Sequence, residues 1–152
     1  MAVQTRVNND TTPFILGGQS LVKKGTIAQD ESRTTVLKKY TVLAQVASTG
    51  KYTPYVSTSQ TTGASVPSAI YLGDDIAAAD LVAGDVTGVD ILVGGGCIVD
   101  KNQVVYDGGT LSNATVVNGA AANPYFVVTA EKCLSLFGIY QQDTIDISEI
   151  EN

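Results

Sequence analysis

The apolar residues of this chain stand in short runs that end at glycine or at other turn-forming residues. Runs of four to six mostly apolar or β-branched residues occupy positions 41–46, 69–72 and 88–93, and they are followed by Ser-Thr-Gly at 48–50, by Gly73 and by three glycines at 94–96. Runs of this length are typical of strands and are too short for most helices. The pattern therefore predicts a mostly β fold.

Further β segments follow from the same criteria. We expect extended chain at 19–28 with Leu21, Val22 and Ile27 as its buried anchors, a hairpin made by 41–46 and 51–56, and strands at 104–106 and 126–128. Pro54 lacks a backbone N–H, so it predicts an edge position for the second hairpin strand.

A single helix is clearly signalled, near the C-terminus. Thr129 is a good N-cap, residues 130–137 follow it, and Gly138 stands where a left-handed residue ends a helix. Cys133, Leu134 and Phe137 share one face, which we expect to pack on the sheet. The alanine-rich residues 76–79 are compatible with one further helical turn.

The domain organisation predicted is one compact β-rich domain over 19–152 with an extended N-terminal arm over 1–18. Hydrophobic residues make up 44% of the chain and charged residues 16%, a balance typical of a folded domain. Residues 1–18 have no sustained period, and their apolar part is Phe14, Ile15 and Leu16. Such a segment either docks on its own domain or extends toward a partner.

No segment predicts export or membrane insertion. The first ten residues lack a basic stretch followed by an apolar one, and no apolar run approaches the roughly 20 residues that span a bilayer. We expect a protein that is made in a cytoplasm and stays soluble. Cys97 and Cys133 are then expected to be buried thiols and not a disulfide.

Charge is divided unevenly along the chain, whose net charge is −6. Up to Lys51 there are seven basic and three acidic residues; from Tyr52 onward there are two basic and twelve acidic residues. The net charge argues against nucleic acid as a partner. A basic beginning on an acidic body favours self-association or an acidic protein partner, and chance asymmetry is the alternative.

The usual catalytic and metal-binding patterns are missing. The chain has no histidine, which excludes Ser-His-Asp and Cys-His catalysis. The three glycines at 94–96 lack the Gly-Lys-Ser/Thr ending of a phosphate loop and are interpreted as a turn. The expectation is a protein with no catalytic residues, no metal and no cofactor. The aspartates spaced by five residues do not match a calcium loop and are interpreted as turn residues: Asp75, Asp80, Asp85 and Asp90.

Four tyrosines stand in or beside the predicted strands: Tyr40, Tyr52, Tyr55 and Tyr71. They are either ordinary strand residues or interface anchors on an exposed sheet face.

Several of these segments resemble the head decoration proteins of tailed bacteriophages, the lambda-like capsid-stabilising family. The similar segments are Thr-Ile-Ala at 26–28, Val-Leu-Lys-Lys-Tyr-Thr-Val-Leu-Ala at 36–44 and Gly-Lys-Tyr at 50–52, with weaker similarity at 69–72, 90–94 and 136–140. The order and spacing of these short motifs carry the resemblance, which covers most of residues 14–140. Glycines are usual in the family where this chain has Tyr40 and Ala44.

The resemblance implies a structural protein and not an enzyme. Proteins of that family bind as homotrimers to the outer surface of the expanded capsid, at three-fold and quasi-three-fold sites, and cement the major capsid protein. The resemblance thus implies a virion location after synthesis in the host cytoplasm, with no nucleic acid or membrane as partner. An N-terminal arm typically adds its backbone to a capsid strand.

The arm and the first basic residues are the predicted capsid-binding site. Thr12, Phe14, Ile15 and Leu16 are expected to be arm anchors, and Arg6, Lys23 and Lys24 to steer toward acidic capsid surface. Two other classes remain as alternatives: a secreted or appendage-borne adhesive β module, and a hydrolase that uses Asp74 or Asp75.

Overall fold

The computed structural model describes residues 13–56, 63–117 and 128–143. It confirms a mostly β protein with a short C-terminal helix. In chain order the elements are β1 (Ile15–Gly18), β2 (Leu21–Ile27), β3 (Val42–Gln45), β4 (Tyr52–Pro54), β5 (Ala69–Tyr71), α1 (Ala78–Ala83), β6 (Val86–Gly94), β7 (Cys97–Asp100), the 3-10 helix η1 (Lys101–Gln103), α2 (Ala130–Leu136) and β8 (Ile139–Gln142).

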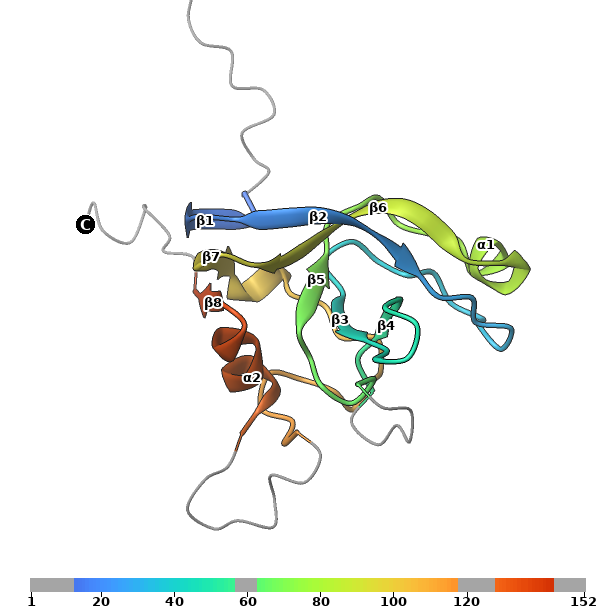
Figure 1. Ribbon diagram of the computed structural model, residues 1–152. Helices are drawn as coiled ribbons and strands as arrows, with labels where there is room; N and C mark the ends of the chain where they lie inside the picture. Colours follow the sequence, from blue (N-terminus) through green and yellow to red (C-terminus); the bar gives the residue numbers. More distant parts are fainter. Residues whose placement is uncertain (1–12, 57–62, 118–127, 144–152) are drawn as a thin grey trace, which may run out of the picture.

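Five strands form a closed barrel in the order β2-β4-β3-β5-β6. The barrel closes where β6 pairs antiparallel with β2, from Leu21 opposite Gly94 to Ile27 opposite Val86. Figure 1 shows these two strands running side by side along one edge of the body, with α1 at their far end. The predicted hairpin is confirmed, since β3 and β4 pair antiparallel.

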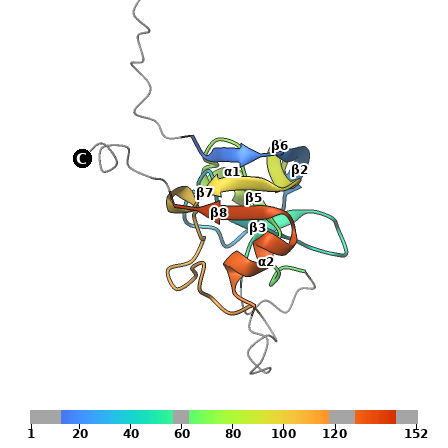
Figure 2. The ribbon, with the colours of Figure 1, turned by 90° about the vertical axis from the view of Figure 1, so that its left-hand side faces the viewer.

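A three-stranded sheet lies against the barrel in the order β1-β7-β8. Strand β7 is central, antiparallel to β1 and parallel to β8. Figure 2 shows the three strands stacked one below the other with α2 below β8. The predicted caps of α2 are confirmed: the Thr129 side chain accepts a hydrogen bond from the Lys132 N–H, and Gly138 has a φ of +85° just beyond the helix.

The strands with continuous apolar runs bury both of their faces. Leu43 and Ile91 point into the barrel, whereas their neighbours Val42 and Leu92 point out toward the three-stranded sheet. Strand side chains alternate between faces, so a run without polar residues needs a core on each side. The first core, inside the barrel, consists of Ile27, Leu37, Leu43, Tyr52, Ala69, Tyr71, Ile76, Leu81 and Ile91.

The second core lies between the barrel, the sheet and α2. It consists of Phe14, Val42, Ala44, Tyr55, Ile70, Leu92, Cys97, Val99, Ala130, Leu134 and Ile139. The predicted buried thiols are confirmed, because Cys97 and Cys133 are both buried and free.

Glycines stand close together where β1 leads into β2, where β6 leads into β7 and where α2 leads into β8. Gly18 has a φ of +75° and Gly94 a φ of +136°, both in the region that only glycine adopts without strain. A Cβ atom on Gly18 would collide with the Gly96 carbonyl, and one on Gly94 with the Phe137 carbonyl. Residues 94–96 are thus a glycine bend between β6 and β7 and not a β-turn that reverses the chain, because the antiparallel pairing continues from Leu21 opposite Gly94 to Gly18 opposite Cys97.

Some local predictions are wrong because a distant partner decides the outcome. Pro54 is not in an edge strand, because β4 is one of the five barrel strands and lies between β2 and β3. In β4 only Tyr52 pairs with β2, so the missing N–H of Pro54 breaks no hydrogen bond between these two strands. Residues 104–106 form no strand; Val105 makes only an isolated bridge to Thr41. The predicted strand at 126–128 lies almost entirely outside the described residues.

Three predicted core positions are exposed instead. Ile27 is fully buried, but Leu21 and Val22 are 57% and 41% exposed, and Phe137 is 45% exposed. Cys133 and Leu134 do pack as expected. Within the described ranges, neither helix is long and apolar enough to cross a membrane.

Candidate interaction surface

The predicted capsid-binding residues fall into three groups in the structure. Arg6 and Thr12 lie outside the described residues. Phe14 is 5% exposed just before β1, where Ile15 is 36% exposed and Leu16 is half-buried. Lys23 and Lys24 lie on β2.

The base of the N-terminal segment is docked on the body. Phe14 stacks on Tyr40 with ring centroids 3.9 Å apart and an interplanar angle of 10°. The Phe14 carbonyl accepts a hydrogen bond from the Asp100 N–H at 2.8 Å, and the Gln103 side-chain amide donates to the Pro13 carbonyl at 3.3 Å. Of the two interpretations of this segment, docking on its own domain therefore holds for residues 13–18.

Tyr40 holds the docked segment from an unusual backbone conformation. It is the one non-glycine residue of the described part with a positive φ, +70°. Its backbone is held on both sides, since its N–H donates to the Tyr71 carbonyl and its carbonyl accepts from the Val105 N–H. A bulky residue in this region costs on the order of 1–3 kcal/mol, and such strain concentrates at functional sites.

Strand β1 lies at the edge of its sheet and is entered directly from the segment that precedes Phe14. Among the described strands β7 is its only neighbour, so within the described residues its other side is an edge. An open edge is the surface that strand addition uses.

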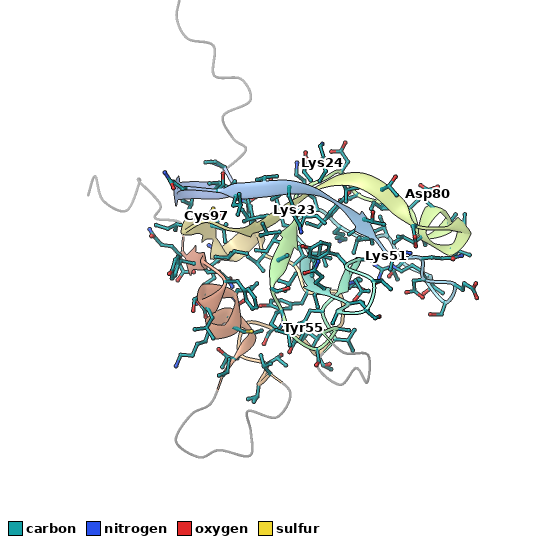
Figure 3. The ribbon with its side chains drawn as sticks, viewed as in Figure 1. Lys23, Lys24, Lys51, Tyr55, Asp80 and Cys97 are labelled. Carbon is teal, nitrogen blue, oxygen red and sulfur yellow. The ribbon has the colours of Figure 1, made fainter. Side chains whose placement is uncertain are left out.

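The two lysines of β2 point to opposite faces of the strand, as Figure 3 shows. Lys24 pairs with Asp90 at 2.7 Å on the outer face. Lys23 instead places its ammonium 5.4 Å from the centroid of the Tyr52 ring. No carboxylate within the described ranges pairs with Lys23, so its charge is available to a partner.

Lys23 stands in the open mouth of the barrel. The mouth is a pocket of about 380 Å³ lined by residues from four barrel strands together with Phe137 and the segment before β5: Lys23, Gln45, Tyr52, Gly63, Val66, Ser68, Val93 and Phe137. Gln45 and Val93 lie two residues beyond the interior residues Leu43 and Ile91, so they face the same way. The other end of the barrel is filled by Leu37, Ile76 and Leu81.

The sequence analysis did not recognise this pocket. The period of two along the strands could have indicated that Lys23, Gln45 and Val93 share the inner face, but only the pairing of β2 with β6 brings them to one end of the barrel. The four tyrosines are strand or turn residues and not exposed anchors, since Tyr52, Tyr55 and Tyr71 are buried and Tyr40 is half-buried.

The carboxylates of the described residues are spread over several elements and loops, and the thiols are buried. The described part of the chain holds no cluster of three or more potential metal ligands. Asp75 and Asp85 lie between elements as predicted and accept backbone hydrogen bonds from Lys39 and Gln29, but Asp80 lies in α1 and Asp90 in β6, so for these two the turn prediction is wrong. Burial raises the pKa of both thiols, which disfavours a nucleophilic thiolate.

Comparisons with protein-family models, with curated proteins and with solved structures find no match to this chain.

Proposed function

We propose that this protein is a capsid decoration, or cement, protein that binds the outer surface of an expanded phage head as a homotrimer and stabilises it. Its partner is the major capsid protein, contacted at three-fold and quasi-three-fold sites. The resemblance of residues 14–140 to the lambda-like capsid-stabilising family motivates the proposal, and the geometry of the N-terminal segment supports it.

The observation that carries most weight is the backbone of Tyr40. At this position the family pattern has a glycine, and here the φ of +70° is one that glycine adopts freely and tyrosine does not. The left-handed turn is thus present although the side chain differs. This agreement concerns a single backbone angle that composition and hydrophobic pattern do not demand.

The docking of residues 13–18 gives the proposal a mechanism. Phe14 fixes the base of the arm in the second core, and β1 offers its open edge beside the point where residues 1–12 join the body. Strand addition supplies affinity through main-chain hydrogen bonds, and three arms on one trimer add avidity. A ligand that binds only the expanded lattice stabilises that lattice by mass action.

The steering role is best assigned to Arg6. Lys24 is paired with Asp90, which reduces the charge it offers to a partner. Ile15, 36% exposed, and the half-buried Leu16 lie on the open edge strand, where a capsid strand would contact them.

The test is co-sedimentation with undecorated, expanded heads of the phage that encodes the chain. The deletion should remove residues 1–12 only, because a longer deletion would take Phe14 out of the core and unfold the body. We expect saturation near one copy per capsid subunit for the full chain, and loss of binding for the deletion with an unchanged circular dichroism spectrum.

Two outcomes would contradict the proposal in different ways. Full binding after the deletion would remove the arm mechanism and leave the decoration role. Absence of binding to any expanded head by the full, folded chain would remove the decoration role and favour the adhesive module.

A further inference from the structure

The barrel mouth has the chemistry to bind a segment in which apolar and acidic residues alternate. Its walls include Tyr52, Val66, Val93 and the 45% exposed Phe137, which favour apolar side chains. The polar groups at its rim are donors to an anion: the Lys23 ammonium, unpaired with any carboxylate of the described residues, and the Ser68 hydroxyl. A carboxylate beside Lys23 would form a charge-assisted hydrogen bond with its ammonium group.

The C-terminal residues of this chain have that composition. Residues 144–152 read Thr-Ile-Asp-Ile-Ser-Glu-Ile-Glu-Asn, with Ile145, Ile147 and Ile150 between Asp146, Glu149 and Glu151. Fully extended, nine residues span about 30 Å. This stretch carries the three acidic residues nearest the C-terminus and no basic residue.

The direction of β8 decides whether this segment reaches the barrel mouth of its own molecule or that of a second copy more directly. The strand starts next to Gly138, which contacts the glycines beside the rim residue Phe137, and it ends at Gln142 opposite Asp100. Four residues of strand carry the chain about 13 Å away from the mouth. The chain after β8 would have to reverse its direction to reach the barrel mouth of its own molecule. The barrel mouth of a neighbouring molecule can lie in the direction in which β8 already runs.

We propose that the barrel mouth receives residues 144–152 of a second copy of this chain, with an acidic side chain on Lys23 and isoleucines against Val93 and Phe137. The inference rests on the self-association contained in the proposed function. A contact of this kind joins two different surfaces, and such head-to-tail contacts form a ring when the rotation from one copy to the next closes and an open filament when it does not. Three copies would give a trimer whose members are linked through Lys23.

The test measures self-association of the full chain by sedimentation velocity over a range of concentrations. The two variants are Lys23→Gln and Lys24→Gln, which remove the same charge from neighbouring residues on opposite faces of β2. We expect Lys23→Gln to weaken association about tenfold or more and Lys24→Gln to leave it unchanged within about twofold. A synthetic peptide of residues 143–152, in excess, should dissociate the assembly of the full chain.

Each remaining outcome overturns the inference. It fails if the two variants associate equally well, if the peptide has no effect, or if the full chain stays monomeric at every concentration. A peptide in which Asp146, Glu149 and Glu151 are replaced by Asn or Gln is the control for charge, and it should not compete. Capsid binding by the full chain is measured separately: binding without Lys23-dependent self-association would show that the decoration role stands although this contact does not.

Discussion

Each of the two cores encloses a fully buried tyrosine, but only one of the two phenols has a hydrogen-bond partner. In the barrel, the Tyr71 hydroxyl donates to the Asp74 carbonyl at 2.6 Å. In the second core, the Tyr55 hydroxyl finds no partner among the described residues. Burial is the main reason why the pKa of both phenols is raised.

The difference follows from how the two cores are assembled. The barrel core is enclosed by strands that pair with one another all the way round. The second core collects Phe14 from one end of the chain and Leu134 and Ile139 from the other, and it borders the two edge strands β1 and β8. A core made of such separate pieces is easier to open, which suits the region from which the arm leaves.

The prediction with the largest expected effect tests whether the barrel core is more rigid than the second core. Ile91→Ala in the barrel and Ile139→Ala in the second core remove the same atoms from fully buried side chains. We expect losses of about 4 kcal/mol for Ile91 and about 2–3 kcal/mol for Ile139, because an edge strand can relax into the cavity. Urea unfolding measures both, and equal losses would contradict the comparison.

The second prediction concerns the ion pair that joins the barrel side to the loop after β7. The Arg33 side chain is 5% exposed and donates to both oxygens of Asp107, which is 22% exposed. Arg33→Met should cost about 2–3 kcal/mol in unfolding free energy, since it leaves a half-buried carboxylate unpaired. The double variant with Asp107→Leu should recover part of the loss; a double variant worse than the sum of the single ones would argue against this.

The third prediction isolates the strain at Tyr40. Tyr40→Gly and Tyr40→Ala both lose the stack on Phe14, but only glycine adopts the φ of +70° freely. The glycine variant should be more stable than the alanine variant by about 1 kcal/mol in thermal or urea unfolding. Equal stability would mean that the turn relaxes and that the strain is not retained.

The fourth prediction returns to the two phenols. Tyr71→Phe should lower stability by about 1 kcal/mol, because the Asp74 carbonyl loses its donor. Tyr55→Phe removes a hydroxyl with no partner, so it should leave stability unchanged or raise it by up to about 1 kcal/mol. The reverse order in urea unfolding would reject the distinction between the cores.

The smallest effect is a pH dependence at the barrel end that carries α1. The pKa of Asp85 is lowered, first by the hydrogen bond from the Lys51 ammonium and then by that from the Gln29 N–H. A lowered folded-state pKa means that the contribution is present above the unfolded value and is lost as the pH falls through the folded one. Wild type should therefore be slightly more stable than Asp85→Asn at pH 7, and the two should converge in strong acid.

Thermal unfolding across this pH range measures the convergence. Asp80→Asn on α1 is the control, because no ion pair involves Asp80 in the described part of the chain. A constant gap between wild type and Asp85→Asn at all pH values would contradict the assignment.

Short-range signals were enough to predict several elements of this fold. Mostly apolar runs at 41–46, 69–72 and 88–93 predicted strands; the first two contain β3 and β5, and the third lies within β6. Thr129 and Gly138 marked the ends of α2 because capping and left-handed termination involve only neighbouring residues. The absence of histidine was likewise a property of the chain alone.

Tertiary structure decided which faces are covered and which residues meet. The sequence pattern predicts Leu21 and Phe137 as core residues, yet they are exposed because nothing in the described part of the chain packs over them. The sequence left open whether Phe14 docks on its own domain or extends toward a partner. Phe14 is docked because it stacks on Tyr40, 26 positions away in the chain. The Lys23 pocket exists only because β2 pairs with β6 from the other half of the chain. Hydrophobic periodicity predicts which residues share a face, but burial depends on contacts between segments that are distant in sequence.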